Sequence, residues 1–388
     1  MAHPSRRLAW ILASLALLGC RKGSDTQNTS FIPVLPSPFG TQACWPLATV
    51  PTTADAFPLA AIGPMSQIAA AAGSETIFLT GADGSVHQLD FAGGGAPPVD
   101  TVLVASGVIE ASFLVPAGIG LAAELSGIAV LDNQFLVVAE HSSNTLLGVR
   151  RDLPDTVVPL AGLPLGTGGF SDGVGGGIRF HFTQPVSILA ETGGNVIIGD
   201  TENHALRTVQ LVGLPTCATI SGTGAPGTAF GALPSTQLDT PSGLAGTCGG
   251  ELLVVESGRA GLGGNRLLSL AIGSASFFGG FEGSSVVLAG NGLDATVEGV
   301  GTLASLGTPE GLVTTEDGLA YWVDSSEGIL RRFDLATGLC DCPQFASCAA
   351  AVTAGGSYDG AHFSLALGDS GSLYLLEADA GVLHRIDP

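Results

Sequence analysis

Short apolar segments alternate with glycine-rich turns along most of this chain, in a motif that returns about every 60 residues. The clearest copies span 184–209 and 308–333. Each copy has an apolar run after a proline, a glycine turn, a second apolar run that ends in Asp, a polar turn and a third apolar run. A repeat of this length that contains only short strands predicts one four-stranded sheet repeated around an axis. The pattern therefore predicts an all-β, six-bladed β-propeller.

Every repeat divides into an innermost strand A, strands B and C, and a more variable outer strand D. The A strands are expected to begin near Gln67, Gly127, Val186, Gly243, Gly311 and Phe363. The B strands are expected at 76–80, 134–140, 195–200, 251–256, 319–324 and 372–377, each followed by a C strand. The D strands are expected at 101–106, 156–162, 217–222, 285–290 and 350–356.

Six A-B-C sets with five D strands leave the last blade one strand short. The segment 56–63 has the same character as the D strand at 156–162, so we expect the N-terminal part of the chain to complete the last blade. This exchange closes the ring and removes two exposed strand edges. Deleting 44–63 is therefore expected to destabilise the whole domain.

The first twenty residues have the organisation of a bacterial lipoprotein signal. Arg6 and Arg7 precede an apolar stretch at 8–18, which is too short to span a bilayer and leads into the sequence LLGC. This ending resembles a lipobox, whose cysteine, here Cys20, is acylated and becomes the new N-terminus. The alternative is an ordinary cleaved signal with an incidental cysteine.

These features predict three parts: a signal peptide at 1–19, a flexible Ser/Thr/Pro-containing tether at 20–43, and a propeller at 44–388. Acyl chains on Cys20 would hold the protein at a membrane without spanning it. We therefore expect a lipid-anchored protein of the bacterial cell envelope, either periplasmic or surface-exposed.

The chain is strongly acidic, with a formal net charge of −21. Nucleic-acid binding needs a basic surface that displaces counterions from phosphate, so we expect no nucleic-acid partner. Anionic lipid surfaces are disfavoured for the same reason, which leaves the lipid anchor as the membrane contact. A basic or cation-bridged partner is electrostatically favoured, whereas the simpler alternative is that the charge keeps an exported protein soluble.

Six cysteines follow Cys20, and an even number favours disulfides in an exported protein. The sequence leaves fifteen pairings open. A zinc cluster at 340–348 is an alternative, but it lacks CxxC spacing and a nearby histidine. The cysteines expected to form disulfides are Cys44, Cys217, Cys248, Cys340, Cys342 and Cys348.

The segment 157–209 contains a hydrophobic-Ala-Gly strand end, a glycine-rich loop with FSDG, an aromatic residue at Phe180, a strand that ends in Asp200, and the sequence NHALR. It resembles the NHL repeat, as does a second copy at 286–333, and the resemblance covers roughly 57–388. It implies a six-bladed propeller that is more often a binding scaffold than an enzyme. The chain departs from the family in having a single Asn-His pair and in lacking the basic faces of RNA-binding members.

Acidic residues recur where the B strands end and in the loops before the A strands. The B–C and D–A loops of a propeller emerge on the same face, so these acids are expected to form an acidic rim around the mouth of the axial channel. The alternative is that the strand-end acids accept backbone N–H bonds inside the B–C turns. The rim hypothesis predicts that this face binds a divalent cation or a basic partner. The residues assigned to this face are Glu140, Asp172, Asp200, Glu202, Glu256, Glu298, Asp324, Glu327, Asp359 and Glu377.

Propeller lyases and lactonases hold a metal ion in the axial channel, with ligands near the start of several innermost strands. Here those positions carry mainly serines, with Glu310 as the one acid. His141 and His204 end B strands and are expected to reach the rim. No His/acid trio is evident, so we assign no catalytic residue and keep His141, His204 and Glu310 as channel candidates.

We therefore expect a non-enzymatic binding or scaffolding propeller of the cell envelope that recognises a protein or a glycan. A metal-dependent enzyme of the lactonase or lyase kind is the alternative, and a purely structural surface protein is a third class. No cofactor is predicted, although the acidic rim would suit a divalent cation. The ligand, the membrane leaflet, the disulfide pairing and the oligomeric state stay open.

Overall fold

In this computed structural model the described residues span 53–387, with gaps at 60–64, 72–73, 92–96, 115–121, 133, 163–167, 184, 192, 277–279 and 343–361. They belong to one compact unit, Ser37–Pro388. The signal peptide, Cys20 and the tether lie outside the described residues and stay predictions. Within the described ranges, no helix has the length and apolarity needed to cross a bilayer.

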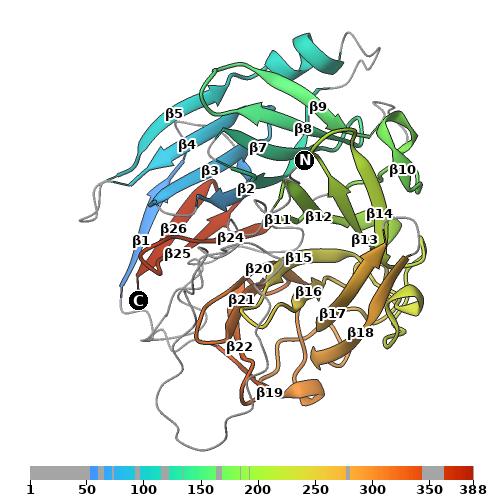
Figure 1. The fold of residues 1–388 in the computed structure, drawn as a ribbon. Helices are drawn as coiled ribbons and strands as arrows, with labels where there is room; N and C mark the ends of the chain where they lie inside the picture. The colour runs from blue at the N-terminus through green and yellow to red at the C-terminus, as the bar shows by residue number, and fades with distance from the viewer. Residues whose placement is uncertain are drawn as a thin grey trace, which may run out of the picture. The chain divides into compact units, whose positions relative to one another are not determined.

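The described strands form six antiparallel sheets, which are the six blades of a propeller (Figure 1). This confirms the predicted fold. Blade one contains, from the axis outward, β2 (Met65–Ala70), β3 (Thr76–Gly81), β4 (Val86–Asp90) and β5 (Val99–Val104). Blade two contains β6 (Leu125–Val130), β7 (Phe135–Glu140), β8 (Thr145–Arg150) and β9 (Val157–Ala161).

Blades three and five carry a fifth, two-residue outer strand. Blade three contains β11 (Ile188–Glu191), β12 (Asn195–Asp200), β13 (Ala205–Gln210), β14 (Thr216–Ser221) and β10 (Gly173–Val174). Blade four contains β15 (Pro241–Gly246), β16 (Leu252–Glu256), β17 (Arg266–Ser276) and β18 (Gly280–Ala289). Blade five contains β20 (Pro309–Thr314), β21 (Leu319–Asp324), β22 (Ile329–Asp334), β23 (Leu339–Asp341) and β19 (Gly299–Val300).

Blade six is built from both ends of the propeller. It contains β24 (Phe363–Leu367), β25 (Leu373–Glu377), β26 (Val382–Asp387) and β1 (Thr53–Pro58). The antiparallel pairing of β1 with β26 joins Thr53 to Asp387 and Pro58 to Val382, so blue and red strands lie side by side in Figure 1. The N-terminal segment therefore closes the last blade, as predicted.

Blade five differs from the prediction in its outer part. The strand that pairs with β22 is β23, whereas the D strand expected at 350–356 lies outside the described residues. Helical segments are short, and the described ones are η1 (Glu110–Leu114), η2 (Gly175–Gly177), η3 (Thr201–Asn203), η4 (Leu233–Ser235) and η5 (Gly301–Leu303).

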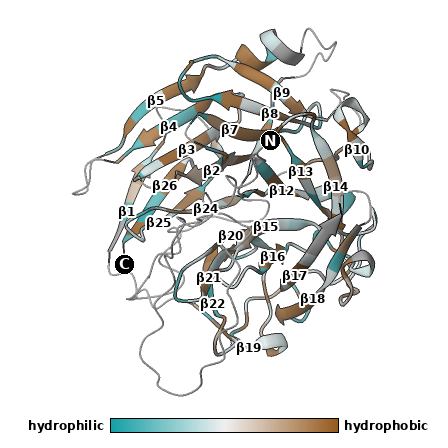
Figure 2. Ribbon diagram, viewed as in Figure 1, coloured by the Kyte–Doolittle hydropathy of each residue, from teal (hydrophilic) through white to brown (hydrophobic). Residues whose placement is uncertain are grey.

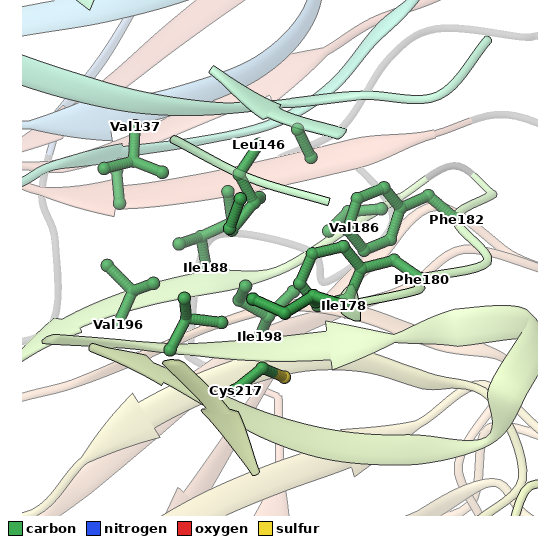
Figure 3. Packing of buried hydrophobic residues seen from close by; sticks show 14 residues of the cluster. Val137, Leu146, Ile178, Phe180, Phe182, Val186, Ile188, Val196, Ile198 and Cys217 are labelled. Carbon is green, nitrogen blue, oxygen red and sulfur yellow. The ribbon is translucent and has the colours of Figure 1, made fainter. Parts of the chain in front are cut away.

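A hydrophobic cluster lies between each pair of neighbouring blades, because side chains alternate between the two faces of a strand. On β12, Val196 and Ile198 pack toward blade two, whereas Ile197 packs toward blade four. Figure 3 shows the cluster between blades two and three, where the rings of Phe180 and Phe182 stack 5.0 Å apart. In Figure 2 hydrophobic colour follows strands such as β7. The apolar runs of the sequence therefore join the blades into a ring.

Candidate ligand-binding channel

The acid that ends the B strand of blade three is buried inside a hydrogen-bond network. Asp200 accepts bonds from the His181 N–H, the Asn203 amide and Arg207 Nη1, each at 2.8 Å. Arg207 is also buried and donates its other terminal nitrogen to Asp172 at 2.7 Å. Burial raises the pKa of Asp200 to about 6, and the Arg207 charge opposes that rise. This carboxylate holds the turn and the outer loop in place.

Blades four and five repeat this arrangement with their own arginines. In blade five, Asp324 accepts bonds from Trp322 Nε1 at 2.7 Å and from Arg331 Nη1 at 2.9 Å. In blade four, Glu256 accepts a bond from Arg266 Nε at 2.8 Å. Burial raises the pKa of Asp324 to about 6 and that of Glu256 to about 7, while the neighbouring guanidinium groups act in the opposite direction.

The strand-end acids of the remaining described blades are buried as well. Glu140 accepts the N–H groups of Ser142 at 3.0 Å and Ser143 at 2.7 Å. Glu377 lies 3.7 Å from His384. Five acids are therefore buried instead of exposed on the predicted acidic face: Glu140, Asp200, Glu256, Asp324 and Glu377. Glu140 accepts N–H groups of its own B–C turn, as the alternative predicted, whereas Asp200 and Glu256 accept main-chain N–H groups of the loop before the A strand, from His181 and from Asp239 at 2.9 Å.

The other acids assigned to that face are exposed or half-buried. Asp172 is committed to Arg207 and to the Thr219 N–H at 3.0 Å. Glu202, Glu298 and Glu327 are exposed. Asp359 lies outside the described residues. The face predicted to be a continuous acidic rim thus keeps only scattered exposed carboxylates among the described residues.

The three channel candidates lie in separate networks. His204 has a left-handed backbone (φ 46°), and its Nδ1 accepts the Thr240 N–H at 3.1 Å. His141 Nδ1 pairs with Glu124 Oε2 at 3.0 Å. Glu310 is buried, accepts the Phe363 N–H at 3.1 Å and pairs with Arg259. The structure does not bring these three side chains together.

His141 instead shares a small cavity with a histidine that the sequence reasoning did not select. This cavity has a volume of about 260 Å³, and His141, Glu124 and His181 are among its lining residues. It lies between blades two and three.

The cysteines divide into two kinds. Cys217 and Cys340 are buried free thiols, which corrects the prediction that all six form disulfides. Burial raises the pKa of Cys217 to about 12 and that of Cys340 to about 11, which makes both thiols inert. Cys248 and Cys342 are disulfide-bonded. Cys44 and Cys348 lie outside the described residues, so the pairing stays open.

The serines near the start of the innermost strands join neighbouring blades. Ser187 Oγ accepts the Leu244 N–H at 2.9 Å, and Ser364 Oγ accepts the Ile68 N–H at 3.1 Å. Ser242 Oγ donates to the Pro309 carbonyl at 2.6 Å. The hydroxyl groups of these three serines are therefore used within the fold.

A cavity of about 500 Å³ occupies the axis of the propeller, and all six innermost strands line it. Each of these strands pairs with a strand of its own sheet on one side only. Its other main-chain edge faces the axis, where some groups bond to a neighbouring blade. Every blade also contributes at least one buried aliphatic side chain to the wall, including Ile68, Ile128, Ile188, Leu244, Leu312 and Leu365.

Charged residues line this cavity at the end where the A strands stop. Glu191 ends β11, Asp132 follows β6, Asp369 follows β24, and Arg151 follows β8. These positions belong to the A–B and C–D end of the blades, opposite the predicted face. The sequence reasoning missed them because it considered the B–C and D–A loops, although Asp132 and Asp369 each follow an A strand by two residues.

The four charged side chains differ in their hydrogen-bond partners. Asp132 accepts the N–H groups of Gln134 at 2.7 Å and Phe135 at 2.8 Å, and its carbonyl accepts Arg151 Nη1 at 3.3 Å. The side-chain carboxylates of Glu191 and Asp369 make no hydrogen bond or ion pair with another described residue. Burial alone raises the pKa of Glu191 to about 7.

Some propellers of this shape are enzymes that could use a metal ion. Such an ion is held by several His, Cys, Asp or Glu side chains placed close together. In the described part of the chain, no group of three or more His, Cys, Asp or Glu side chains is placed to hold one. The residues present therefore do not fit a lactonase-like metal centre.

Comparison with solved structures places the chain among six-bladed propellers. A gluconolactonase from Xanthomonas campestris matches with 15% identity and a TM-score of 0.54, over 91% of this chain and 94% of that chain. An auxiliary nutrient binding protein from Bacteroides thetaiotaomicron matches with 11% identity and a TM-score of 0.53, over 84% and 69%. Virginiamycin B lyase from Staphylococcus aureus matches with 9% identity and a TM-score of 0.50, over 87% and 99%.

These likenesses show the fold, which enzymes and binding proteins share, and do not define an activity. No known family model matches the chain, and no curated protein matches it in sequence. The NHL resemblance therefore stays a prediction.

Proposed function

We propose that this chain is a non-enzymatic binding propeller that takes a small organic ligand into its axial cavity through the A–B end. The observation that carries this proposal is the 500 Å³ cavity lined by all six blades. Its volume lies in the range of small-molecule sites, roughly 300–1,000 Å³. Its wall combines aliphatic side chains with the inner main-chain edges of the A strands, where some groups, such as the Leu244 and Ile68 N–H groups, are already bonded to neighbouring blades.

Binding is favoured over catalysis by the chemistry of the groups around the axis. The serines and Glu310 are engaged in inter-blade contacts, and the donor set does not fit a metal centre. The lactonase-like alternative is supported by the fold. The described residues, however, form no group that could hold a metal ion. An NHL-like binding scaffold agrees with this arrangement, with a glycan fragment or a peptide end as ligands that could enter the cavity.

The same proposal includes the location of the protein in the cell. Acylation of Cys20 and a tether over 20–43 would hold the propeller at the bacterial envelope and leave its faces accessible. Mass spectrometry of the protein expressed in a bacterial host tests this: we expect an acylated Cys20 at the new N-terminus. An unmodified N-terminus at another residue would refute the lipid anchor.

The binding proposal is tested with a blocked cavity. Ala190 lines the cavity from blade three, and Ala190→Phe adds a ring to its wall. Ligand-observed NMR of the full-length chain in detergent, screened against small polar and amphipathic fragments, should detect binders that the variant loses. The unfolding temperature of the variant controls for damage to the fold. Fragments that bind both proteins equally would exclude the axial cavity as the site.

A further inference from the structure

The charged groups around the axial cavity are unbalanced. Three carboxylates, Asp132, Glu191 and Asp369, line it against one guanidinium, that of Arg151. Arg151 is held in place, because it donates to the Asp132 carbonyl and lies over the Phe78 ring at 4.7 Å. The end of the cavity that these residues line therefore has an excess of negative charge.

Two of the carboxylates are available to a ligand. Asp132 is used by its own turn, whereas Glu191 and Asp369 have no polar partner among the described residues. Glu191 is half-buried and also lines the cavity wall. A carboxylate that loses water without gaining a partner is costly, and a cation in the cavity would offset this cost.

The residue types that line the cavity also restrict the kind of ligand that it can bind. None of the described lining residues is Phe, Tyr or Trp, so a cation cannot be held here by an aromatic face. Recognition of positive charge at this site depends on the carboxylates. Below them, the aliphatic side chains of the six blades suit an apolar ligand body.

We infer that the cavity selects a small organic cation, whose protonated amine lies beside Glu191 and whose apolar body enters between the innermost strands. This inference rests on the proposed function, since it names the ligand class of the same cavity. It differs from the acidic-rim hypothesis in using the opposite end of the propeller and carboxylates outside the strand-end set.

The acid–base state of Glu191 supports this assignment. Its pKa is raised to about 7 by burial, so it is largely protonated at pH 6 and ionised at pH 8. The other charged groups that line the cavity are Asp132, Asp369 and Arg151. An amine should therefore bind more tightly at pH 8 than at pH 6, and Glu191→Gln should remove most of that difference.

The test compares three probes that share one body: 4-phenylbutylamine, 4-phenylbutan-1-ol and 4-phenylbutyrate. Binding to the full-length chain is measured by ligand-observed NMR titration at pH 8. We expect the amine to bind about ten-fold more tightly than the alcohol, and the carboxylate more weakly than both. Glu191→Gln should bring the amine to the level of the alcohol and leave the alcohol unchanged.

Glu316→Gln is the matched control. Glu316 lies in the A–B turn of blade five, on the same face, and does not line the cavity. This variant removes an identical charge and should leave the preference for the amine intact. An equal loss in both variants would mean that the general field of the face, rather than Glu191, attracts the amine, and would overturn the inference.

The remaining outcomes separate the two proposals. If amine and alcohol bind equally and Ala190→Phe abolishes both, the cavity is a ligand site without charge selection, and only the cation inference fails. If none of the probes binds, or if Ala190→Phe leaves binding unchanged, the cation inference and the assignment of ligands to this cavity both fail.

Discussion

The two ends of the propeller blades use acidic residues in opposite ways. At the B–C end, Asp200, Glu256 and Asp324 are buried and each is paired with an arginine of the next strand. At the A–B end, Glu191 and Asp369 line the axial cavity without a polar partner among the described residues. Under the proposed function, the acidic residues that bind a ligand are the accessible and uncompensated ones, not the ones that recur at the ends of the B strands.

Blades three, four and five each use a strand-end acid to hold the arginine of the next strand. A buried carboxylate that accepts main-chain N–H groups and a guanidinium satisfies donors that would otherwise be unpaired. Of the cavity acids, Asp132 and Asp369 share one repeat position, whereas Glu191 lies one residue earlier in its blade. This comparison leads to three predictions about stability and one about ligand binding.

The largest effect is expected at the B–C end. Asp324→Asn leaves the buried guanidinium of Arg331 without its carboxylate. Breaking a buried ion pair from one side costs about 3–5 kcal/mol of unfolding free energy. Urea unfolding at pH 8 measures this loss. The exposed Glu327→Gln in the following turn is the control and should change stability by less than about 0.5 kcal/mol.

A similar, small cost for both substitutions would contradict the structural role given to the strand-end acids. Asp324 would then again be a candidate for contact with a binding partner.

A smaller effect of opposite sign is expected at the A–B end. The pKa of Glu191 is raised from 4.5 to about 7 in the folded protein, so folding favours its protonated form. The stability that this provides is present below pH 4.5 and is lost as the pH rises through 7. Glu191→Gln should therefore be more stable than the wild type at pH 8 by about 1–2 kcal/mol after allowance for solvent screening, and nearly equal to it at pH 4.

Urea unfolding of both proteins between pH 4 and pH 8 provides this measurement. A variant that is less stable than the wild type at pH 8 would show that Glu191 has a stabilising partner. It would then belong with the structural acids of the other end.

The smallest effect concerns the serines near the start of the A strands. Ser187→Ala removes the acceptor of the buried Leu244 N–H and should cost about 1 kcal/mol of unfolding free energy. Ser284→Ala, at an exposed position of β18, should cost less than about 0.5 kcal/mol. Ser284→Ala should leave the affinity for 4-phenylbutylamine unchanged, and Ser187→Ala, in the cavity wall away from Glu191, should change it little. If the Ser187→Ala variant had normal stability but bound the amine more weakly, the ligand would lie near Ser187 and not beside Glu191. This result would contradict the account.

The strands and their order were predictable because each depends on a local pattern. Apolar runs bounded by glycine turns located all six A-B-C sets, and the missing outer strand implied the closure by β1. The outer strand of blade five was not located, since β23 is only three residues long and contains Cys340 and Asp341.

The role of the strand-end acids carried a signal that the sequence reasoning did not use. In blades three and five an arginine follows the acid by seven residues, at Arg207 and Arg331. Strand pairing brings this arginine back to the acid, which indicates a buried pair. The cavity acids had no such signal, because a polar A–B turn looks the same whether or not a cavity reaches it.

The most direct test of the central claim is isothermal titration calorimetry of 4-phenylbutylamine at pH 6, in two buffers with different ionisation enthalpies. If the amine binds beside Glu191, the carboxyl must ionise, and we predict the release of about one proton per amine bound. Glu191→Gln should release none. A wild-type binding enthalpy that is identical in both buffers would contradict the account, because it would mean that the amine binds without Glu191.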